Sequence, residues 1–101
     1  MSEVKIELPR DQIEAFCRKW KVKEFALFGS VLREDFRPDS DVDVLVDLLP
    51  NHGLSMYDWV DMIDELKEIF GRDVDLVDKT AIRNPFRRHA ILSSYEVVYA
   101  A

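Results

Sequence analysis

Three short groups of residues carry side chains that could bind ions or move protons: Gly29-Ser30, Asp41-Val42-Asp43 and Asp75. Gly29-Ser30 follows the apolar run Phe25–Phe28 and begins an expected helix. A glycine there lets the backbone approach an anion closely, and the start of a helix presents free N–H groups to it. Gly-Ser turns of this kind are also common as plain structural elements, so the pair alone leaves both interpretations open.

Asp41 and Asp43 lie two residues apart at the start of the valine-rich segment DVDVLVDL. Side chains at this spacing on a strand point to the same face, so the two carboxylates could hold one cation or a close pair of cations. A solvated strand end is the alternative. An EF-hand loop is excluded, because Val44 stands where its glycine is required and Pro50 where its last glutamate is required.

Asp75 lies between Val74 and Leu76 in a short apolar strand. A carboxylate is costly to bury without a partner, so a metal or a role as general base would explain it. We expect Asp73 and Asp78 to be ordinary surface charges.

The elements that must position these residues alternate between helices and strands. We expect a capping box at Ser55 and Asp58, a helix end at Gly71 and a helix restart at Pro85. Met56, Trp59, Val60, Ile63, Leu66 and Phe70 form the expected apolar stripe of the middle helix. The expected order is helix 9–20, strand 25–28, short helix 30–36, strand 41–48, helix 55–70, strand 73–77, helix 80–94 and edge strand 96–99. This order predicts an α/β (α+β) fold, a small mixed sheet with helices packed on it, as one domain over residues 1–101.

Composition excludes several classes of protein. The chain has 101 residues and a net charge of -6, and residues 39–78 contain twelve acidic and two basic side chains. Such a chain is a poor general binder of nucleic acid, so no direct nucleic acid binding is expected. Cys17 is the single cysteine, which excludes an internal disulfide, and we expect it to be core. No apolar run is long enough for a membrane span, and we expect a soluble cytoplasmic domain.

The segment LFGSVLREDFRPDSDVDVLV, residues 27–46, resembles the signature of the minimal nucleotidyltransferase (MNT) branch of the DNA polymerase beta-like superfamily. The resemblance extends from about residue 9 to residue 99. Leu32 stands where many members have alanine, and Glu34 where they often have glycine. The positions of the family motif are occupied by Gly29, Ser30, Arg33, Ser40, Asp41, Asp43 and Asp75.

The resemblance implies a polymerase beta-like nucleotidyltransferase fold and metal-assisted nucleotidyl transfer. Asp41 and Asp43 would hold two Mg²⁺ ions, and Asp75 would complete the second metal site and could take the proton of the attacking hydroxyl. Gly29 and Ser30 would cradle the phosphates of ATP. Arg33 would neutralise charge on the leaving pyrophosphate, and Ser40 would complete the nucleotide-binding set.

A chain of this size has few residues for an acceptor pocket, so we expect a second polypeptide to supply the acceptor. Members of the family are typically encoded beside a HEPN-domain ribonuclease toxin and can transfer AMP to one of its tyrosines. The resemblance therefore implies an adenylyltransferase antitoxin. The alternatives are an antitoxin that acts by binding alone and an enzyme that modifies a small molecule such as an aminoglycoside. Arg83, Arg87 and Arg88 form a basic helix face, either solvated or docked to an acidic partner.

Overall fold

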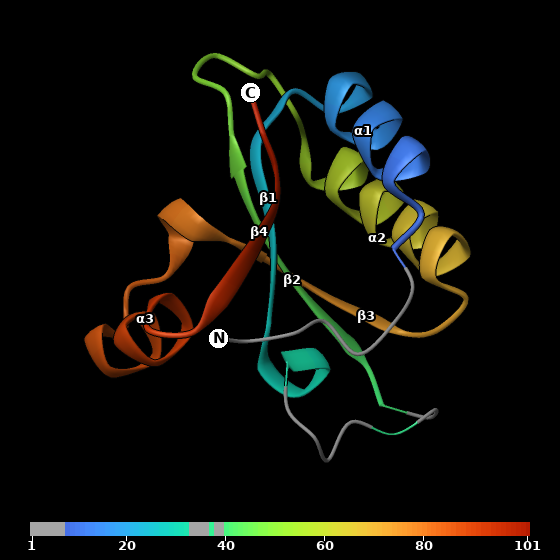
Figure 1. Ribbon diagram of the computed structural model, residues 1–101. Helices are drawn as coiled ribbons and strands as arrows, with labels where there is room; N and C mark the ends of the chain where they lie inside the picture. The colour runs from blue at the N-terminus through green and yellow to red at the C-terminus, as the bar shows by residue number, and fades with distance from the viewer. Residues whose placement is uncertain (1–7, 33–36, 38–39) are drawn as a thin grey trace.

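The structure of the chain is a computed structural model that describes residues 8–32, 37 and 40–101 (Figure 1). None of the described helices is long and apolar enough to cross a membrane. The described residues form four strands and three α-helices, with short 3₁₀ turns η1 and η2 after β1 and β3. Their bounds are α1 Arg10–Lys19, β1 Val22–Phe28, η1 Gly29–Leu32, β2 Val42–Leu48, α2 Met56–Phe70, β3 Val74–Asp78, η2 Lys79–Ala81, α3 Pro85–Leu92 and β4 Tyr95–Ala100.

The four strands form one mixed sheet in the order β3-β2-β1-β4. β1 pairs antiparallel with both β2 and β4, whereas β2 and β3 are parallel and are connected through α2. A parallel pair needs such a crossover, since its strands run in the same direction. The mixed sheet with helices packed on it confirms the predicted fold class, and β4 is an edge strand as predicted.

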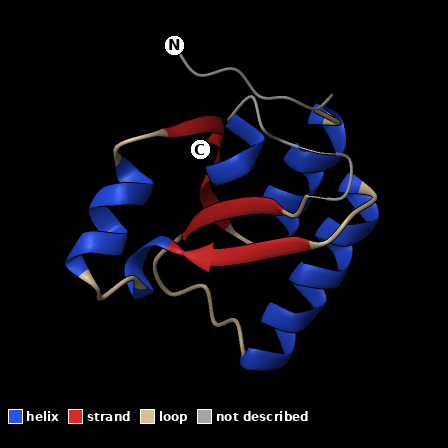
Figure 2. Cartoon of the chain, turned by 90° about the horizontal axis from the view of Figure 1, so that it is seen from below, coloured by secondary structure: helices blue, strands red, loops and turns tan. Residues whose placement is uncertain are grey.

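The two faces of the sheet are covered unequally. α1 and α2 lie together on one face, and α3 lies against the other (Figures 1 and 2). The first face holds the main core, in which Phe16 and Phe25 meet edge to face at 5.9 Å between ring centroids. On the second face Ile91 of α3 packs with Ala26, Phe28 and Leu45. This smaller cluster leaves part of the second face available for polar side chains.

The structure corrects several predicted boundaries. β1 begins at Val22, three residues before the predicted strand. The prediction missed these residues because the polar side chains of Lys23 and Glu24 hid the strand pattern. The helix predicted from Ser30 to Phe36 begins as the 3₁₀ turn η1, and residues 33–36 lie outside the described residues. The last predicted helix is divided between η2 and α3. The restart at Pro85 is confirmed, and the Asn84 side chain accepts hydrogen bonds from the N–H groups of Phe86 and Arg87.

The predicted apolar stripe of α2 is wrong at two positions. Met56 is 80% exposed and Val60 is 53% exposed, whereas Met62 and Leu66 are fully buried. The buried face is centred on Met62, Leu66 and their neighbours at i, i+3 and i+4 spacing. Met56 and Val60 lie to one side of that face, since each residue turns the helix by about 100°.

The capping box at the start of α2 is confirmed. The Ser55 hydroxyl accepts a hydrogen bond from the Asp58 N–H at 3.3 Å, and the Asp58 carboxylate accepts one from the Ser55 N–H at 2.8 Å. We predict that Ser55→Ala lowers the free energy of unfolding by about 1 kcal/mol, measured by urea denaturation. Ser94→Ala is the control, because Ser94 is exposed and outside any cap; an equal loss in both variants would contradict the prediction.

Candidate active site

Asp43 and Asp75 lie side by side on the two parallel strands. Their Cα atoms are register partners between β2 and β3, so both side chains project from the same face of the sheet. The alternating residues Val42, Val44 and Leu76 are buried on the opposite face. The two carboxylates therefore lie on the face that carries α3.

Asp75 is exposed, which corrects the argument that its strand would bury it. Its neighbours Val74 and Leu76 point into the core and account for the apolar pattern of the segment. Asp75 itself lies on the more open face of an edge strand, so its carboxylate keeps contact with solvent. An exposed carboxylate beside a second one can be reached by a substrate.

The Gly29 turn lies directly against Asp43. Phe28, the last residue of β1, is the register partner of Asp43. Gly29 follows with a φ of +74°, and a Cβ added there would lie 2.2 Å from Asp43 Oδ2. Only a glycine combines this backbone conformation with so close a carboxylate. Gly29 is thus a predicted nucleotide-binding residue whose backbone lies beside the carboxylate pair of Asp43 and Asp75.

The segment before the aspartates is held by Arg72, which precedes β3. Its guanidinium donates hydrogen bonds to the backbone carbonyls of Arg37 at 3.3 Å and Ser40 at 3.2 Å. The Ser40 hydroxyl accepts a hydrogen bond from the Arg37 N–H at 3.0 Å, so its observed contact is within this turn. Arg72 was not among the predicted site residues. In the sequence it stands out only as one of the two basic residues in the acidic segment 39–78.

Of the remaining predicted site residues, the structure describes Asp41 but not Arg33 or the side chain of Ser30. Asp41 is exposed and lies just before β2, two residues from Asp43. Arg33 lies outside the described residues, as does the side chain of Ser30. In the described part of the chain, no three His, Cys, Asp or Glu side chains are spaced to hold a metal ion together. Asp43 and Asp75 offer a pair of oxygen donors, the ligand type that Mg²⁺ prefers, rather than a closed cage.

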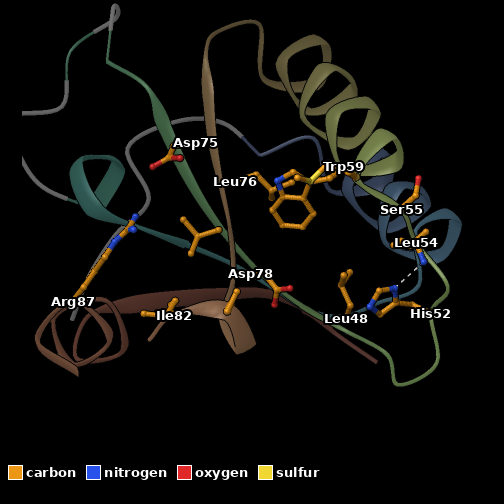
Figure 3. Close-up of a pocket in the computed structure, with 13 residues that line it drawn as sticks. Leu48, His52, Leu54, Ser55, Trp59, Asp75, Leu76, Asp78, Ile82 and Arg87 are labelled. Carbon is orange, nitrogen blue, oxygen red and sulfur yellow. Dashed lines mark hydrogen bonds between the residues drawn. The ribbon is translucent and has the colours of Figure 1, made fainter. Parts of the chain in front are cut away.

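A pocket of about 520 Å³ adjoins Asp75 (Figure 3). Trp59 packs against the main core, as predicted from the sequence, and also lines this pocket. Met56, which was predicted to be core as well, is 80% exposed and lines the pocket. Its walls come from the last residue of β2, from the start of α2 and the loop before it, from β3 and from the η2–α3 segment. The lining residues are Leu48, His52, Leu54, Ser55, Met56, Trp59, Asp75, Leu76, Val77, Asp78, Ala81, Ile82 and Arg87.

Cys17 is core, as predicted, and lies away from these residues on α1. Burial, with a smaller contribution from Glu14, raises the pKa of its thiol to about 12. The thiol therefore stays protonated and enclosed, and the thiolate is the reactive form. We predict that a thiol-specific reagent at mildly alkaline pH labels Cys17 only after denaturation, as measured by mass spectrometry. Complete labelling of the native protein within minutes would contradict this.

A mixed sheet that sets a glycine turn against one of two paired aspartates is the arrangement of a polymerase beta-like minimal nucleotidyltransferase. Comparison with known proteins agrees with it. Residues 9–98 match the family model of the nucleotidyltransferase domain, and the chain belongs to this family.

Two curated relatives are similar over most of their length. A candidate protein adenylyltransferase of Methanocaldococcus jannaschii is 36% identical over 91 residues, which are 90% of each chain. The protein adenylyltransferase MntA of Thermococcus cleftensis is 32% identical over 83 residues, 80% of this chain and 77% of that protein. The chain is thus homologous to MntA.

Solved structures share the fold. A candidate minimal nucleotidyltransferase superposes with a TM-score of 0.68 at 28% identity and covers 87% of this chain and 85% of its own. A toxin-antitoxin complex with AMP-PNP gives 0.74 at 21% identity, with 93% and 75% covered. A complex of a tri-AMPylated HEPN toxin of Shewanella oneidensis with its MNT antitoxin gives 0.66 at 20%, with 91% and 70% covered.

Proposed function

We propose that this protein transfers AMP from ATP to a tyrosine hydroxyl of a HEPN-domain toxin and so acts as its antitoxin. The observation that carries the proposal is the position of Asp43, whose carboxylate contacts the Gly29 turn and lies beside Asp75. The adenylyltransferase names of the relatives and the AMPylated toxin in the Shewanella complex support the reaction and the partner.

The residues of the site suit a reaction with a nucleoside triphosphate. The Gly29 backbone gives phosphates a close approach, while Asp41 and Asp43 would hold two Mg²⁺ ions. When bound, these ions neutralise phosphate charge and lower the pKa of the attacking hydroxyl. By family resemblance, Ser30 and Arg33 are assigned to the phosphates, and Ser40 completes the nucleotide-binding set.

Asp75 is suited to the acceptor side of the same reaction. Its exposed carboxylate takes the proton of the tyrosine hydroxyl, and the oxygen attacks the α-phosphorus of ATP. A bond forms between that oxygen and the phosphorus, the bond to the bridging oxygen breaks, and pyrophosphate leaves. The products are the AMP-tyrosine ester and pyrophosphate, so no further reactant is needed.

The test uses the protein together with the HEPN-domain protein that we expect to be encoded beside it. Both are incubated with labelled ATP and Mg²⁺, and the partner is analysed by mass spectrometry. We expect an AMP adduct on a tyrosine with the wild type and none with the Asp41→Asn, Asp43→Asn double variant. Equal neutralisation of the toxin by both proteins without an adduct would overturn catalysis in favour of binding alone. Label on an added aminoglycoside instead would overturn the protein acceptor.

A further inference from the structure

The pocket beside Asp75 lies along the outer edge of β3. It is lined by four consecutive residues of that strand, Asp75 to Asp78. Consecutive residues of a strand point to opposite faces, so only a space at the strand's edge touches all four. The inner edge of β3 is occupied by β2, which leaves the outer edge. In Figure 3, β3 passes between the pocket residues of the α2 side and those of the α3 side.

The backbone of this edge carries groups that do not pair with β2. The Val42 N–H donates to the Asp73 carbonyl at 3.0 Å, so Asp73, Asp75 and Val77 direct their backbone groups toward β2. In a parallel ladder the intervening residue, Leu76, directs its N–H and C=O away from β2. Among the described residues no hydrogen bond outside the sheet involves these two groups. Leu76 is only 7% exposed, and it reaches the surface in the lining of the pocket. A row of such groups at a sheet edge is a template for another extended strand.

The walls of the pocket suit the side chains of a peptide. Leu54, Met56 and Trp59 line the α2 side, and Ala81, Ile82 and Arg87 line the opposite side. Apolar walls with a few placed polar groups are typical of binding pockets of this size. An extended peptide on β3 would send alternate side chains to the two walls.

We propose that the pocket beside Asp75, called the groove from here on, binds the acceptor polypeptide as an extended strand along the outer edge of β3. This inference rests on the proposed function. Asp75 belongs both to the carboxylate pair and to the lining of the groove. The phosphate turn at Gly29 follows β1, which is two strands away from β3, or about 10 Å. The two substrates therefore reach Asp75 from opposite sides, with ATP from the β1 side and the acceptor from the sheet edge. Main-chain pairing provides affinity, and the two walls provide selectivity.

A matched pair of variants tests this assignment. Ala81 lines the groove and is exposed, and Ala90 on α3 is exposed outside it. Ala81→Trp fills the groove with a neutral side chain, whereas Ala90→Trp adds the same side chain elsewhere. Transfer of AMP to the HEPN partner and affinity for AMP-PNP are measured for both variants, with circular dichroism to verify folding. We expect Ala81→Trp to lower kcat/KM for the partner by about tenfold or more, with AMP-PNP affinity unchanged. Ala90→Trp should leave both quantities unchanged.

Two results would overturn the proposal. Equal transfer by both variants would show that the groove is not used, and a loss of AMP-PNP affinity in Ala81→Trp alone would assign the groove to the nucleotide. Absence of transfer by the wild-type protein would instead refute the proposed function, and this inference with it.

A second pair keeps the test decisive if Ala81→Trp does not fold. Met56 is 80% exposed and lines the groove, whereas Val60, one turn further along α2, is exposed outside it. Met56→Gln should raise KM for the partner with little change in kcat, because it removes apolar contact without touching Asp75. Val60→Gln should change neither. Identical kinetics for the two variants would count against the groove.

Discussion

Replacing Asp43 by asparagine should lower the rate of AMP transfer by about 10³-fold, with the fold retained. Asp43 links the two parts of the candidate site, since it contacts the Gly29 turn and lies beside Asp75. Asparagine keeps the shape of the side chain but removes the charge that a cation requires, and interactions of this kind are worth several kcal/mol in a transition state. The measurement is single-turnover transfer from labelled ATP to the partner.

The control for this prediction is Asp47→Asn. Asp47 lies four residues further along β2 and projects from the same face, but it pairs in register with Glu24, away from Gly29. The two substitutions remove the same charge from the same strand. If both variants lose activity equally, the effect comes from the general acidity of the strand and not from the site.

Gly29→Ala should reduce transfer by about 10²-fold, because small displacements of catalytic groups have effects of this size. The new Cβ would lie 2.2 Å from Asp43 Oδ2, so the carboxylate or the turn must move. The backbone at φ +74° adds strain, which for a residue with a side chain costs about 1–2 kcal/mol. Activity and the free energy of unfolding are measured together.

Gly53→Ala separates these two effects. Gly53 has a φ of +69°, and a Cβ there would meet nothing within 4 Å. It should therefore lose similar stability and keep its activity. Loss of activity in Gly53→Ala to the same extent as in Gly29→Ala would show that backbone strain, rather than contact with Asp43, explains the result.

The fold could be predicted from the sequence because its signals are local. The alternating valines of β2, the Ser55–Asp58 capping box and the restart at Pro85 each depend on a few adjacent residues, and the structure contains all three. The start of β1 was missed for the same reason, since Lys23 and Glu24 carry no local sign of a strand that pairs on both sides.

The candidate site was only partly predictable, because it depends on relations between segments. The aspartates were found through their motif, but the register that sets Asp75 opposite Asp43 is a property of the assembled sheet. The same is true of the pocket. Met56 looked like core on a helix considered alone, and it lines a pocket with Trp59 because α2 begins beside the edge of the sheet.

The parallel pairing of β2 with β3 has a consequence for how the protein tolerates insertions and deletions. The segment between these strands contains α2 and determines which residue of β3 stands opposite Asp43. A slip of one residue would turn Asp75 into the core and bring Val74 or Leu76 to the surface in its place. The length of this connection is therefore as much a requirement of the chemistry as the aspartates themselves, although its helical residues supply none of the carboxylates assigned to the reaction.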